Sequence, residues 1–145
     1  MIHLETITPD NWRLELSVWN NQKKYVSDSM KILARAYAYR NDRSRAFIIY
    51  LDDTPIGMAM YYDIDDMQAY NFSQFFIDRR YQGKGYGFEA AKAILNKMEA
   101  DGKYNKIVLC YVKGDNAARN LYEKLGFRHT GFEDGDEIVM EKAIR

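Results

Sequence analysis

Short runs of apolar residues, several of them alternating with polar ones, recur along the chain and predict β-strands. Turn residues separate the runs, as in the Asp-Asp-Thr-Pro stretch that follows residue 51. The strands predicted in this way are residues 2–7, 45–51, 56–64, 70–77 and 106–112, followed by a hairpin over 127–144 that turns at Asp134-Gly135. The chain is therefore expected to form about seven strands.

Apolar residues spaced at i, i+3, i+4 and i+7 predict helices between these strands. The predicted helices are residues 11–19, a segment from Ser27 or Asp28 to about residue 40, residues 86–100 and residues 115–125. In the first helix, Trp12 and Trp19 are seven residues apart and are expected to form one packed stripe. In the last, Asp115 is the expected N-cap and Gly126 lies just past the end.

The order of the elements indicates the fold class. Because the strands before the 86–100 helix form an antiparallel meander, the order differs from a dinucleotide-binding fold, in which strands and helices alternate. We therefore expect an α+β (α/β) fold. A chain of 145 residues suffices for one buried core, so we expect a single domain over residues 1–145.

The composition limits which partners, bonds and cellular locations are expected for the chain. The 21 Lys and Arg residues balance 21 Asp and Glu residues, so no basic excess favours nucleic acid. The single cysteine, Cys110, cannot form an internal disulfide and is expected to fill the core of an apolar strand. The chain start lacks a secretory signal, and no apolar stretch approaches the ~20 residues of a membrane-spanning helix, so we expect a soluble, cytoplasmic protein. His3 and His129 lack ligand spacing, so no metal site is expected.

Residues 79–89 read RRYQGKGYGFE and place Gly83, Gly85 and Gly87 between a strand and a helix. A helix start leaves about four backbone N–H groups unpaired, and glycines let a phosphate approach them because no β-carbon intervenes. The alternative is that the glycines only permit a tight turn, and their spacing alone does not decide between the two. The spacing is not that of a P-loop, and Phe88 breaks the G-x-G-x-x-G pattern of dinucleotide binders, so a different cofactor is needed.

Two motifs in the expected order resemble those of the GCN5-related N-acetyltransferase (GNAT) family. The stretch from Gln82 to Gly87 matches the Q/R-x-x-G-x-G/A signature of that family, and NLYEKLGF at 120–127 resembles its later helix motif. The resemblance covers residues 2 to about 140. It implies the acyl-CoA N-acyltransferase fold, a mostly antiparallel mixed sheet of about seven strands flanked by about four helices. Q-x-x-Y-V at residues 22–26, FFID and GDEIVM look like the bacterial diamine and polyamine (spermidine/spermine) acetyltransferases.

The resemblance implies acetyl-CoA as the cofactor and a primary amine, with a di- or polyamine preferred, as the acceptor. The pyrophosphate would lie on the amides of residues 82–87, and pantetheine would run along residues 75–77 like an added strand. A free N–H near Phe76 would stabilise the oxyanion. The cofactor-binding residues implied are Phe75, Phe76, Ile77, Gln82, Gly83, Lys84, Gly85, Tyr86, Gly87, Phe88, Asp115, Asn116 and Tyr122.

The same resemblance makes Tyr122 the catalytic acid that protonates the departing CoA thiolate. A phenol with a pKa of about 10 is protonated at neutral pH and donates without special tuning. Helix spacing alone favours an ordinary aromatic residue packed between Leu121 and Leu125, so the role rests on the motif. Asp115 stands where the family usually has asparagine; Asn116 substitutes for it, or Asp115 only caps the helix.

The sequence leaves the base open. Ser73 and Gln74 stand where some polyamine acetyltransferases carry a glutamate, and neither can act as a base. A base or a route to water is required, because an alkylamine is mostly ammonium at pH 7 and only the neutral form attacks a thioester. Asp78, Glu137 or a tyrosine hydroxyl can relay the proton, and the sequence does not choose among them.

Two acidic loops, residues 63–66 and 133–137, would concentrate a polycation if both reach the open end of the acyl site. Solvated turn residues are the alternative for each loop. The candidate substrate-binding residues are Gln22, Tyr25, Asp63 and Glu137. Tyr25 and Val26 alternatively only anchor their segment to the core.

Other functions stay open at this stage. An acetyltransferase acting on a protein N-terminus, an amino acid or an aminoglycoside has the same fold and cofactor loop, because these do not determine the acceptor. A non-catalytic acyl-CoA-binding module is favoured by Asp115 and the missing glutamate. Nucleotide binding through the same loop is a further hypothesis. The oligomeric state is not determined, although family members often form homodimers.

Overall fold

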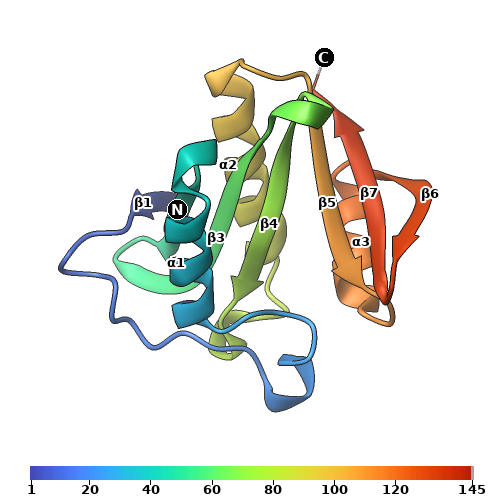
Figure 1. Ribbon diagram of the computed structural model, residues 1–145. Coiled ribbons are helices and arrows are strands. Elements are labelled where there is room, and N and C mark those ends of the chain that lie inside the picture. Colours follow the sequence, from blue (N-terminus) through green and yellow to red (C-terminus); the bar gives the residue numbers. More distant parts are fainter. Residues whose placement is uncertain (145) are drawn as a thin grey trace.

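The computed structural model describes residues 1–144 and contains one seven-stranded mixed sheet with helices on both faces (Figure 1). The sheet order is β1-β2-β3-β4-β5-β7-β6, and only the β4–β5 pair is parallel. The strands are β1 Ile2–Thr6, β2 Arg45–Leu51, β3 Thr54–Ile64, β4 Ala69–Ile77, β5 Lys106–Val112, β6 Arg128–Asp134 and β7 Glu137–Ala143. The described α-helices are α1 Ser29–Ala38, α2 Tyr86–Asp101 and α3 Asn116–Lys124. The predicted fold class and strand number are confirmed, with three described α-helices rather than about four.

The predicted helix over residues 11–19 is wrong. The Thr8 N–H donates to Asn11 Oδ1 over 2.8 Å, and the Asn11 amide donates to the Thr6 carbonyl over 2.9 Å. An asparagine side chain that bonds to nearby backbone offers the chain an alternative to helix, and here it closes a turn. The chain leaves this turn extended rather than helical, apart from a single 3-10 turn at Asn20–Gln22.

The extended segment has a period of two that the helical interpretation overlooked. Leu16 and Val18 are buried and Leu14 is half-buried, while the residues between them are more exposed. Trp12 and Trp19 are 42% and 53% exposed, so the packed tryptophan stripe expected from their spacing is absent. The segment therefore packs against one face of the sheet in an extended conformation instead of as a helix.

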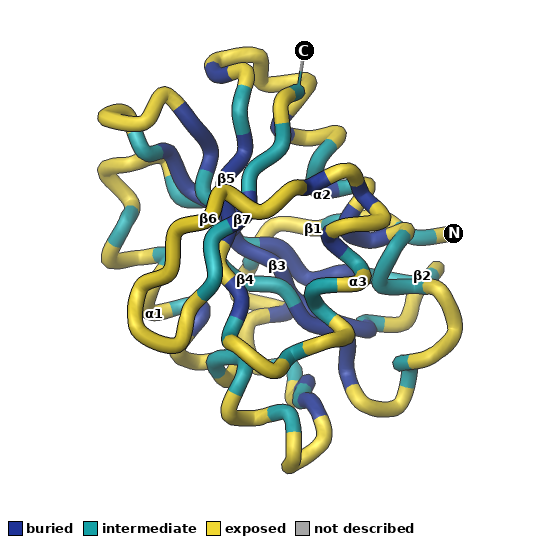
Figure 2. The backbone as a smooth tube through the Cα atoms, turned by 90° about the vertical axis from the view of Figure 1, so that its right-hand side faces the viewer, coloured by how far each residue is buried: buried dark blue, intermediate teal, exposed yellow. Residues whose placement is uncertain are grey.

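Apolar clusters lie on both faces of the sheet. On one face, α2 contributes Ile94 and α3 contributes Tyr122 to a cluster around Tyr70. On the other face, Ile32 of α1 packs with Phe76 of β4. The central strands are buried and β6 is exposed along its length (Figure 2). Each described helix covers the sheet, and none is long and apolar enough to span a bilayer.

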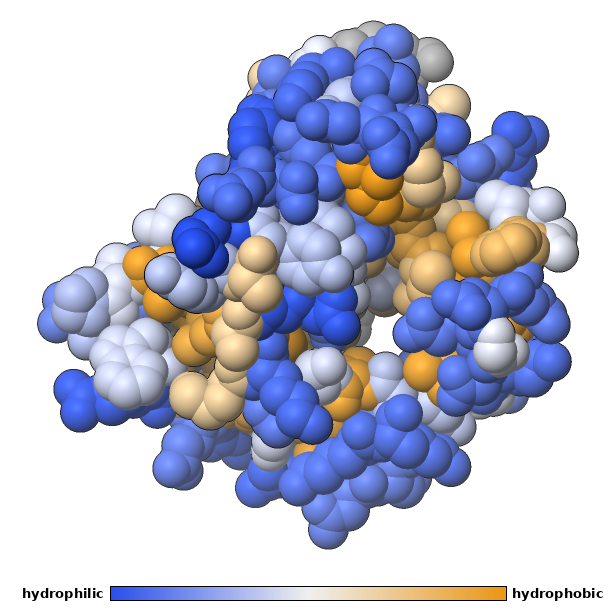
Figure 3. Space-filling view, viewed as in Figure 1, coloured by the Kyte–Doolittle hydropathy of each residue, from blue (hydrophilic) through white to orange (hydrophobic). Residues whose placement is uncertain are grey.

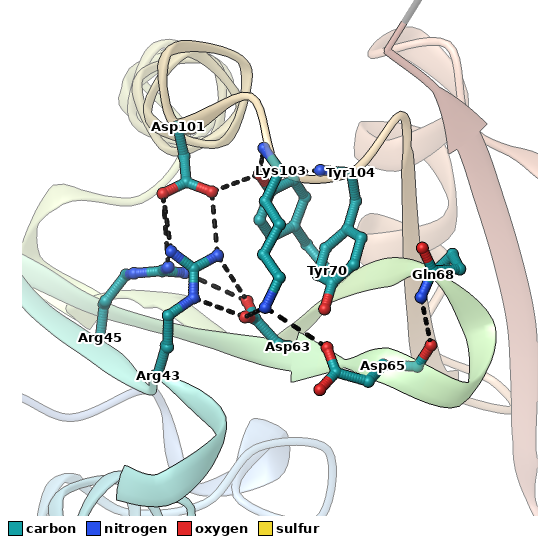
Figure 4. Close-up of polar contacts among 9 residues, drawn as sticks. All are labelled: Arg43, Arg45, Asp63, Asp65, Gln68, Tyr70, Asp101, Lys103 and Tyr104. Atoms are coloured by element: carbon teal, nitrogen blue, oxygen red, sulfur yellow. Dashed lines mark hydrogen bonds and ion pairs between the residues drawn. The ribbon is translucent and has the colours of Figure 1, made fainter.

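Arg43 links the C-terminal end of α2 to the end of β3 (Figure 4). Its guanidinium donates to Asp63 over 2.6 Å and to Asp101 over 3.0 Å. Arg45 lies 3.5 Å from both carboxylates, and the Lys103 ammonium lies 3.3 Å from Asp63. The Asp63 side chain is only 3% exposed, and a buried carboxylate needs partners for its charge. These three cations provide them. The cluster fastens the β3–β4 end of the sheet to α2.

Asp101 makes the stability of this end sensitive to acid. Hydrogen bonds from Arg43 hold the pKa of Asp101 well below its usual value. Such a carboxylate stabilises the fold above its unfolded-state pKa of about 3.9, and the contribution is lost as the pH falls toward the folded-state pKa. We expect Asp101→Asn to lower the free energy of unfolding at pH 7 by about 1–3 kcal/mol, and by less at pH 3, in urea titrations.

Asp66→Asn is the matched control, because Asp66 is exposed in the nearby β3–β4 turn and its carboxylate forms no hydrogen bond or ion pair with another described residue. Its stability is expected to equal that of the wild type at both pH values. If Asp101→Asn lost as much free energy of unfolding at pH 3 as at pH 7, the stabilising role assigned to the ionised Asp101 carboxylate would be contradicted.

Candidate active site

Strands β4 and β5 are joined at one end only. Their pairing consists of Tyr70 with Ile107 and Asn71 with Val108, and beyond these positions the strands diverge (Figure 1). The main-chain groups of residues 72–76 that point toward β5 therefore have no partner strand among the described residues. Such groups need hydrogen-bond partners, and an extended ligand with amide groups supplies them in the manner of an added strand.

A β-bulge in β4 lies beside this gap. Tyr61 of β3 pairs with Phe72 and Met60 pairs with Gln74, so Ser73 is an extra residue without a partner in the described part of β3. A bulge increases local twist and bends the strand that carries it. The bulge therefore helps to turn β4 away from β5 immediately after their last shared pair.

The glycine turn presents unpaired donors. Gly83 and Gly85 have φ angles of 76° and 85°, and Gly85 is the N-cap of α2 without a side-chain cap. Within residues 1–144, no hydrogen bond occupies the N–H groups of residues 82–88. A β-carbon on Gly83 or Gly85 would meet no heavy atom within 4 Å, so both face open space. These donors stand at the start of a 16-residue helix, whose dipole favours an anion such as a diphosphate.

The segment before α1 is hydrogen-bonded to this turn. The Ser17 N–H donates to Asp78 Oδ2 over 2.9 Å, and the Arg79 N–H donates to the Ser17 carbonyl over 2.9 Å. The side-chain amides of Gln22 and Gln82 donate to each other over 3.0 and 2.9 Å. Gln22, a predicted substrate-binding residue, therefore contacts the predicted cofactor loop directly.

Asp78 belongs to these structural contacts. It is 1% exposed, and Arg80 Nε lies 2.8 Å from its carboxylate. Although burial opposes it, hydrogen bonds from Arg80 and from the Ser17 N–H hold the pKa of Asp78 below its usual value. Arg79 is similarly engaged, because its guanidinium donates to the Ser17 hydroxyl over 2.7 Å. Asp78 thus has its oxygens occupied by the protein and does not face the open space beside the turn.

A cleft of about 530 Å³, called here the larger cleft, joins the turn to the gap between β4 and β5. Its walls come from the segment before α1, from β4, from the turn and from the start of α3. The predicted site residues in its lining are Gln22, Tyr25, Phe75, Phe76, Ile77, Gln82, Gly83, Gly87, Asp115, Asn116 and Tyr122. The predicted residues Lys84 and Gly85 lie in the turn, and Tyr86 and Phe88 lie in the first turn of α2, beside the cleft without lining it.

A smaller cavity of about 320 Å³ adjoins this cleft, and Tyr25, Phe75, Asp115 and Tyr122 line both. Glu137, at the start of β7, lines only the smaller cavity. Figure 3 shows the surface hollowed at this place, between the α1 side and the β5–β7 side of the molecule. Two ligands can therefore lie in adjoining spaces and approach each other at the residues that the spaces share.

Sequence analysis missed part of the lining of the smaller cavity. The missed residues include the three cations Lys24, Lys31 and Arg35, and the thiol of Cys110. The expectation that Cys110 fills the core is wrong: it is exposed, whereas its neighbours Leu109 and Tyr111 are buried. Alternate residues of a strand point to opposite faces, and α1 packs on β2 and β3 rather than on β5. Cys110 therefore lies on the face of β5 that α1 leaves uncovered, a placement that the apolar character of the run did not reveal.

Tyr122 lies where the two spaces meet and is 9% exposed. Its ring packs against Phe72 and Phe127 with centroid distances of 6.1 and 5.8 Å. Burial, followed by the nearby Asp115 carboxylate, raises the pKa of the Tyr122 hydroxyl. Asp115 itself accepts from the Ala118 N–H over 3.2 Å and caps α3, as predicted. The phenol is therefore neutral at physiological pH and has a proton to donate.

The two acidic loops do not meet at one site. Asp63 stands opposite Tyr70, at the closed end of the β4–β5 gap, whereas Glu137 stands opposite Val112 at the open end. Asp63 lines neither space, because its carboxylate is held by Arg43 and its neighbours. Among the predicted substrate-binding residues, the structure thus separates Asp63 from the others.

The chain matches the acetyltransferase (GNAT) family over residues 6–127. It belongs to this family. Membership confirms the predicted N-acetyltransferase activity and acetyl-CoA as the acetyl donor. The resemblance inferred from the glycine turn and the NLYEKLGF motif is therefore correct.

Relatives of this GNAT acetyltransferase share its length and fold. The spermine/spermidine N(1)-acetyltransferase of Bacillus subtilis (strain 168) is 29% identical over 151 residues, which is 97% of this chain and 98% of that protein. A crystal structure of spermidine N-acetyltransferase from Vibrio cholerae with CoA and spermine superposes with a TM-score of 0.77 at 21% identity, covering 98% and 95% of the two chains. The aminoglycoside acetyltransferase AAC(6')-Ib with coenzyme A gives 0.79 at 16% identity, covering 99% and 95%.

Gly85 of this GNAT acetyltransferase provides a test of the turn. A residue with a β-carbon is disfavoured at a φ of 85° by about 1–2 kcal/mol, so Gly85→Ala should re-aim the neighbouring amides. We expect the dissociation constant for coenzyme A to rise by about tenfold in isothermal titration calorimetry. Gly131→Ala is the matched control, because Gly131 has a φ of 88° and faces open space in β6. Unchanged affinity in both variants would exclude the turn as the cofactor site.

Proposed function

We propose that this acetyltransferase transfers the acetyl group of acetyl-CoA to a primary amine of a di- or polyamine, by direct attack of the amine in a ternary complex. The observation that carries the proposal is that two spaces, one reaching the glycine turn and one containing Glu137, meet at Tyr122. Donor and acceptor then react across the boundary between them, with positioning as the main contribution of the protein. The relatives named for spermine and spermidine support the acceptor class.

The residues of the larger cleft fit acetyl-CoA. Unpaired N–H groups over residues 82–88 suit its diphosphate, and unpaired main-chain groups over residues 72–76 suit the amides of its pantetheine arm. When bound, acetyl-CoA supplies an activated thioester carbonyl. The candidate donors for the oxyanion are the unpaired N–H groups of β4, either near Phe76, as the sequence predicts, or beside the bulge at Ser73.

Direct attack is favoured over transfer through a cysteine. Although Cys110 is exposed to the cavity, partial burial of its thiol, followed by the carboxylates of Glu137 and Asp134, raises the pKa of that thiol. The thiolate is the reactive form, so this environment keeps Cys110 a poor nucleophile although it lines the smaller cavity. The amine itself is then the attacking group.

In this proposal Tyr122 donates one proton during the reaction and Glu137 accepts another. Tyr122 keeps its proton at neutral pH, and its hydroxyl has no hydrogen-bond partner within residues 1–144, so the proton is available for the leaving thiolate. Glu137 receives the proton of the incoming ammonium, directly or through water. It lines the smaller cavity and makes no ion pair within the described residues, whereas Asp78 and Asp115 are engaged in backbone contacts.

Removal of the Tyr122 hydroxyl should affect turnover more than binding. We expect Tyr122→Phe to lower kcat by about 100-fold and to leave the dissociation constant for acetyl-CoA within about twofold. Tyr104→Phe is the control, since its hydroxyl is buried without a partner in the described chain and lies outside both spaces. Stopped assays of CoA release and calorimetry give the two quantities. Equal turnover in Tyr122→Phe and wild type would refute the acid role.

Loss of the Glu137 carboxylate should matter most where the amine is protonated. We expect Glu137→Gln to lower kcat/KM about tenfold at pH 7, with a defect that shrinks as the pH rises toward the amine pKa of about 10. Glu133→Gln, in the same hairpin but paired with Lys113 at 3.6 Å, should show no such pH dependence. A Glu137→Gln defect of the same size at every pH would leave Glu137 a binding residue only.

Measurement of free CoA over a panel of amines separates this proposal from its alternatives. Turnover with aminoglycosides, amino acids or peptide N-termini but not with polyamines would favour a different acceptor within the family. Binding of acetyl-CoA without turnover on any amine would favour a non-catalytic module. A single domain over residues 1–145, a cytoplasmic location and a homodimer stay predictions of the sequence.

A further inference from the structure

The smaller cavity has two walls of opposite charge. The wall on the α1 side carries Lys24, Lys31 and Arg35, and is called here the basic wall. The wall on the side of α3 and β7 carries Asp115 and Glu137. A polycation that enters this cavity therefore meets attraction on one side and repulsion on the other.

The cations of the basic wall are not neutralised by the protein. Within residues 1–144 none of Lys24, Lys31 and Arg35 forms an ion pair. The Arg35 guanidinium lies over the Tyr39 ring at 5.8 Å, a contact that leaves its charge in place. Asp28 accepts from the Lys31 backbone N–H over 2.9 Å and caps α1, without pairing with the Lys31 ammonium. The basic wall thus disfavours a second ammonium beside it.

The opposite wall continues outward along the β6–β7 hairpin. Asp134 stands directly opposite Glu137 in the ladder, one step farther from β5. Both carboxylates raise the pKa of the Cys110 thiol, after burial, so their charge is felt inside the cavity. Glu133 is partly neutralised by Lys113, at 3.6 Å. Glu137 and Asp134 therefore form a short acidic path that leads from the cavity to solvent.

No second acidic path reaches the cavity from the β3–β4 turn. Asp63 and Asp65 lie within 3.3 and 3.5 Å of the Lys103 ammonium, and Asp63 is also held by Arg43. This turn lies at the closed end of the β4–β5 gap, away from Glu137. Of these charged surfaces, only the basic wall and the β6–β7 hairpin therefore decide where the other ammonium groups of a bound polycation extend.

We propose that this division of charge fixes the direction in which a di- or polyamine binds. The reacting amine lies at Tyr122, and the remaining ammonium groups extend along the β6–β7 hairpin past Glu137 and Asp134. Lys31 and Arg35 exclude them from the α1 side. The inference rests on the proposed function, because it concerns the same acceptor, and it makes acceptor length a determinant of specificity.

The test compares kcat/KM for propylamine, 1,4-diaminobutane and spermidine at saturating acetyl-CoA. We expect Asp134→Asn to lower the ratio of spermidine to propylamine by about three- to tenfold, because one attractive charge on the outward path is lost. The double substitution Lys31→Gln and Arg35→Gln should raise the same ratio by about three- to tenfold. Asp66→Asn, in the β3–β4 turn at the closed end, is the matched control and should leave the ratio unchanged.

Ratios within one variant cancel losses of folded enzyme, so each outcome is decisive. A wild-type ratio in Asp134→Asn, or a ratio in the double variant that does not rise above the wild-type value, would overturn the proposed direction. Faster turnover of 4-aminobutyrate than of 1,4-diaminobutane, lost in the double variant, would also overturn it, because the basic wall would then bind a carboxylate of the acceptor. Absence of turnover with every amine, propylamine included, would instead overturn the proposed function itself.

Discussion

The parting of β4 from β5 is the constraint on which the site depends. The two strands share only the pairs Tyr70–Ile107 and Asn71–Val108, and the main-chain groups beyond them face a gap in the middle of the sheet. A buried N–H or C=O without a partner costs about 1–3 kcal/mol, so these groups require a ligand or water. The larger cleft and the smaller cavity occupy the gap, and Tyr122 stands between them. In the proposed function, binding and chemistry use polar groups that an unbroken sheet would pair within itself.

Several local features keep the gap open and its ends fixed. At the closed end, the Tyr70 hydroxyl donates to Asp101 over 2.5 Å, so the residue that begins the β4–β5 pairing is tied to the ion cluster on α2. Along β4, Gly57 of β3 lets the strands approach, since a β-carbon there would overlap the Phe76 carbonyl oxygen. At the open end, the Gln22–Gln82 pair fastens the segment before α1 to the glycine turn. The larger cleft is therefore framed by strands, a helix start and side-chain amides.

The smaller cavity is framed differently from the larger cleft, by charged side chains rather than by backbone groups. Its basic wall comes from α1 and the residues before it, and its acidic wall comes from β7 and the start of α3. Relatives named for spermidine and for aminoglycosides superpose on this chain with TM-scores of 0.77 and 0.79, so the shared backbone does not select the acceptor. In the proposed function, selection comes from charges such as Arg35 and Glu137, which line the smaller cavity.

Local chemistry by itself determined the strands, the glycine turn and the cap at Asp115, because strand period, positive φ and helix capping depend on neighbouring residues. The segment over 11–19 was misjudged where an Asn11 side chain closed a turn and a period of two was present. Only the tertiary structure separated Asp63 from Glu137, exposed Cys110, and brought Lys31 and Arg35 to the cavity. These placements follow from the order and register of strands far apart in sequence, which no local pattern encodes.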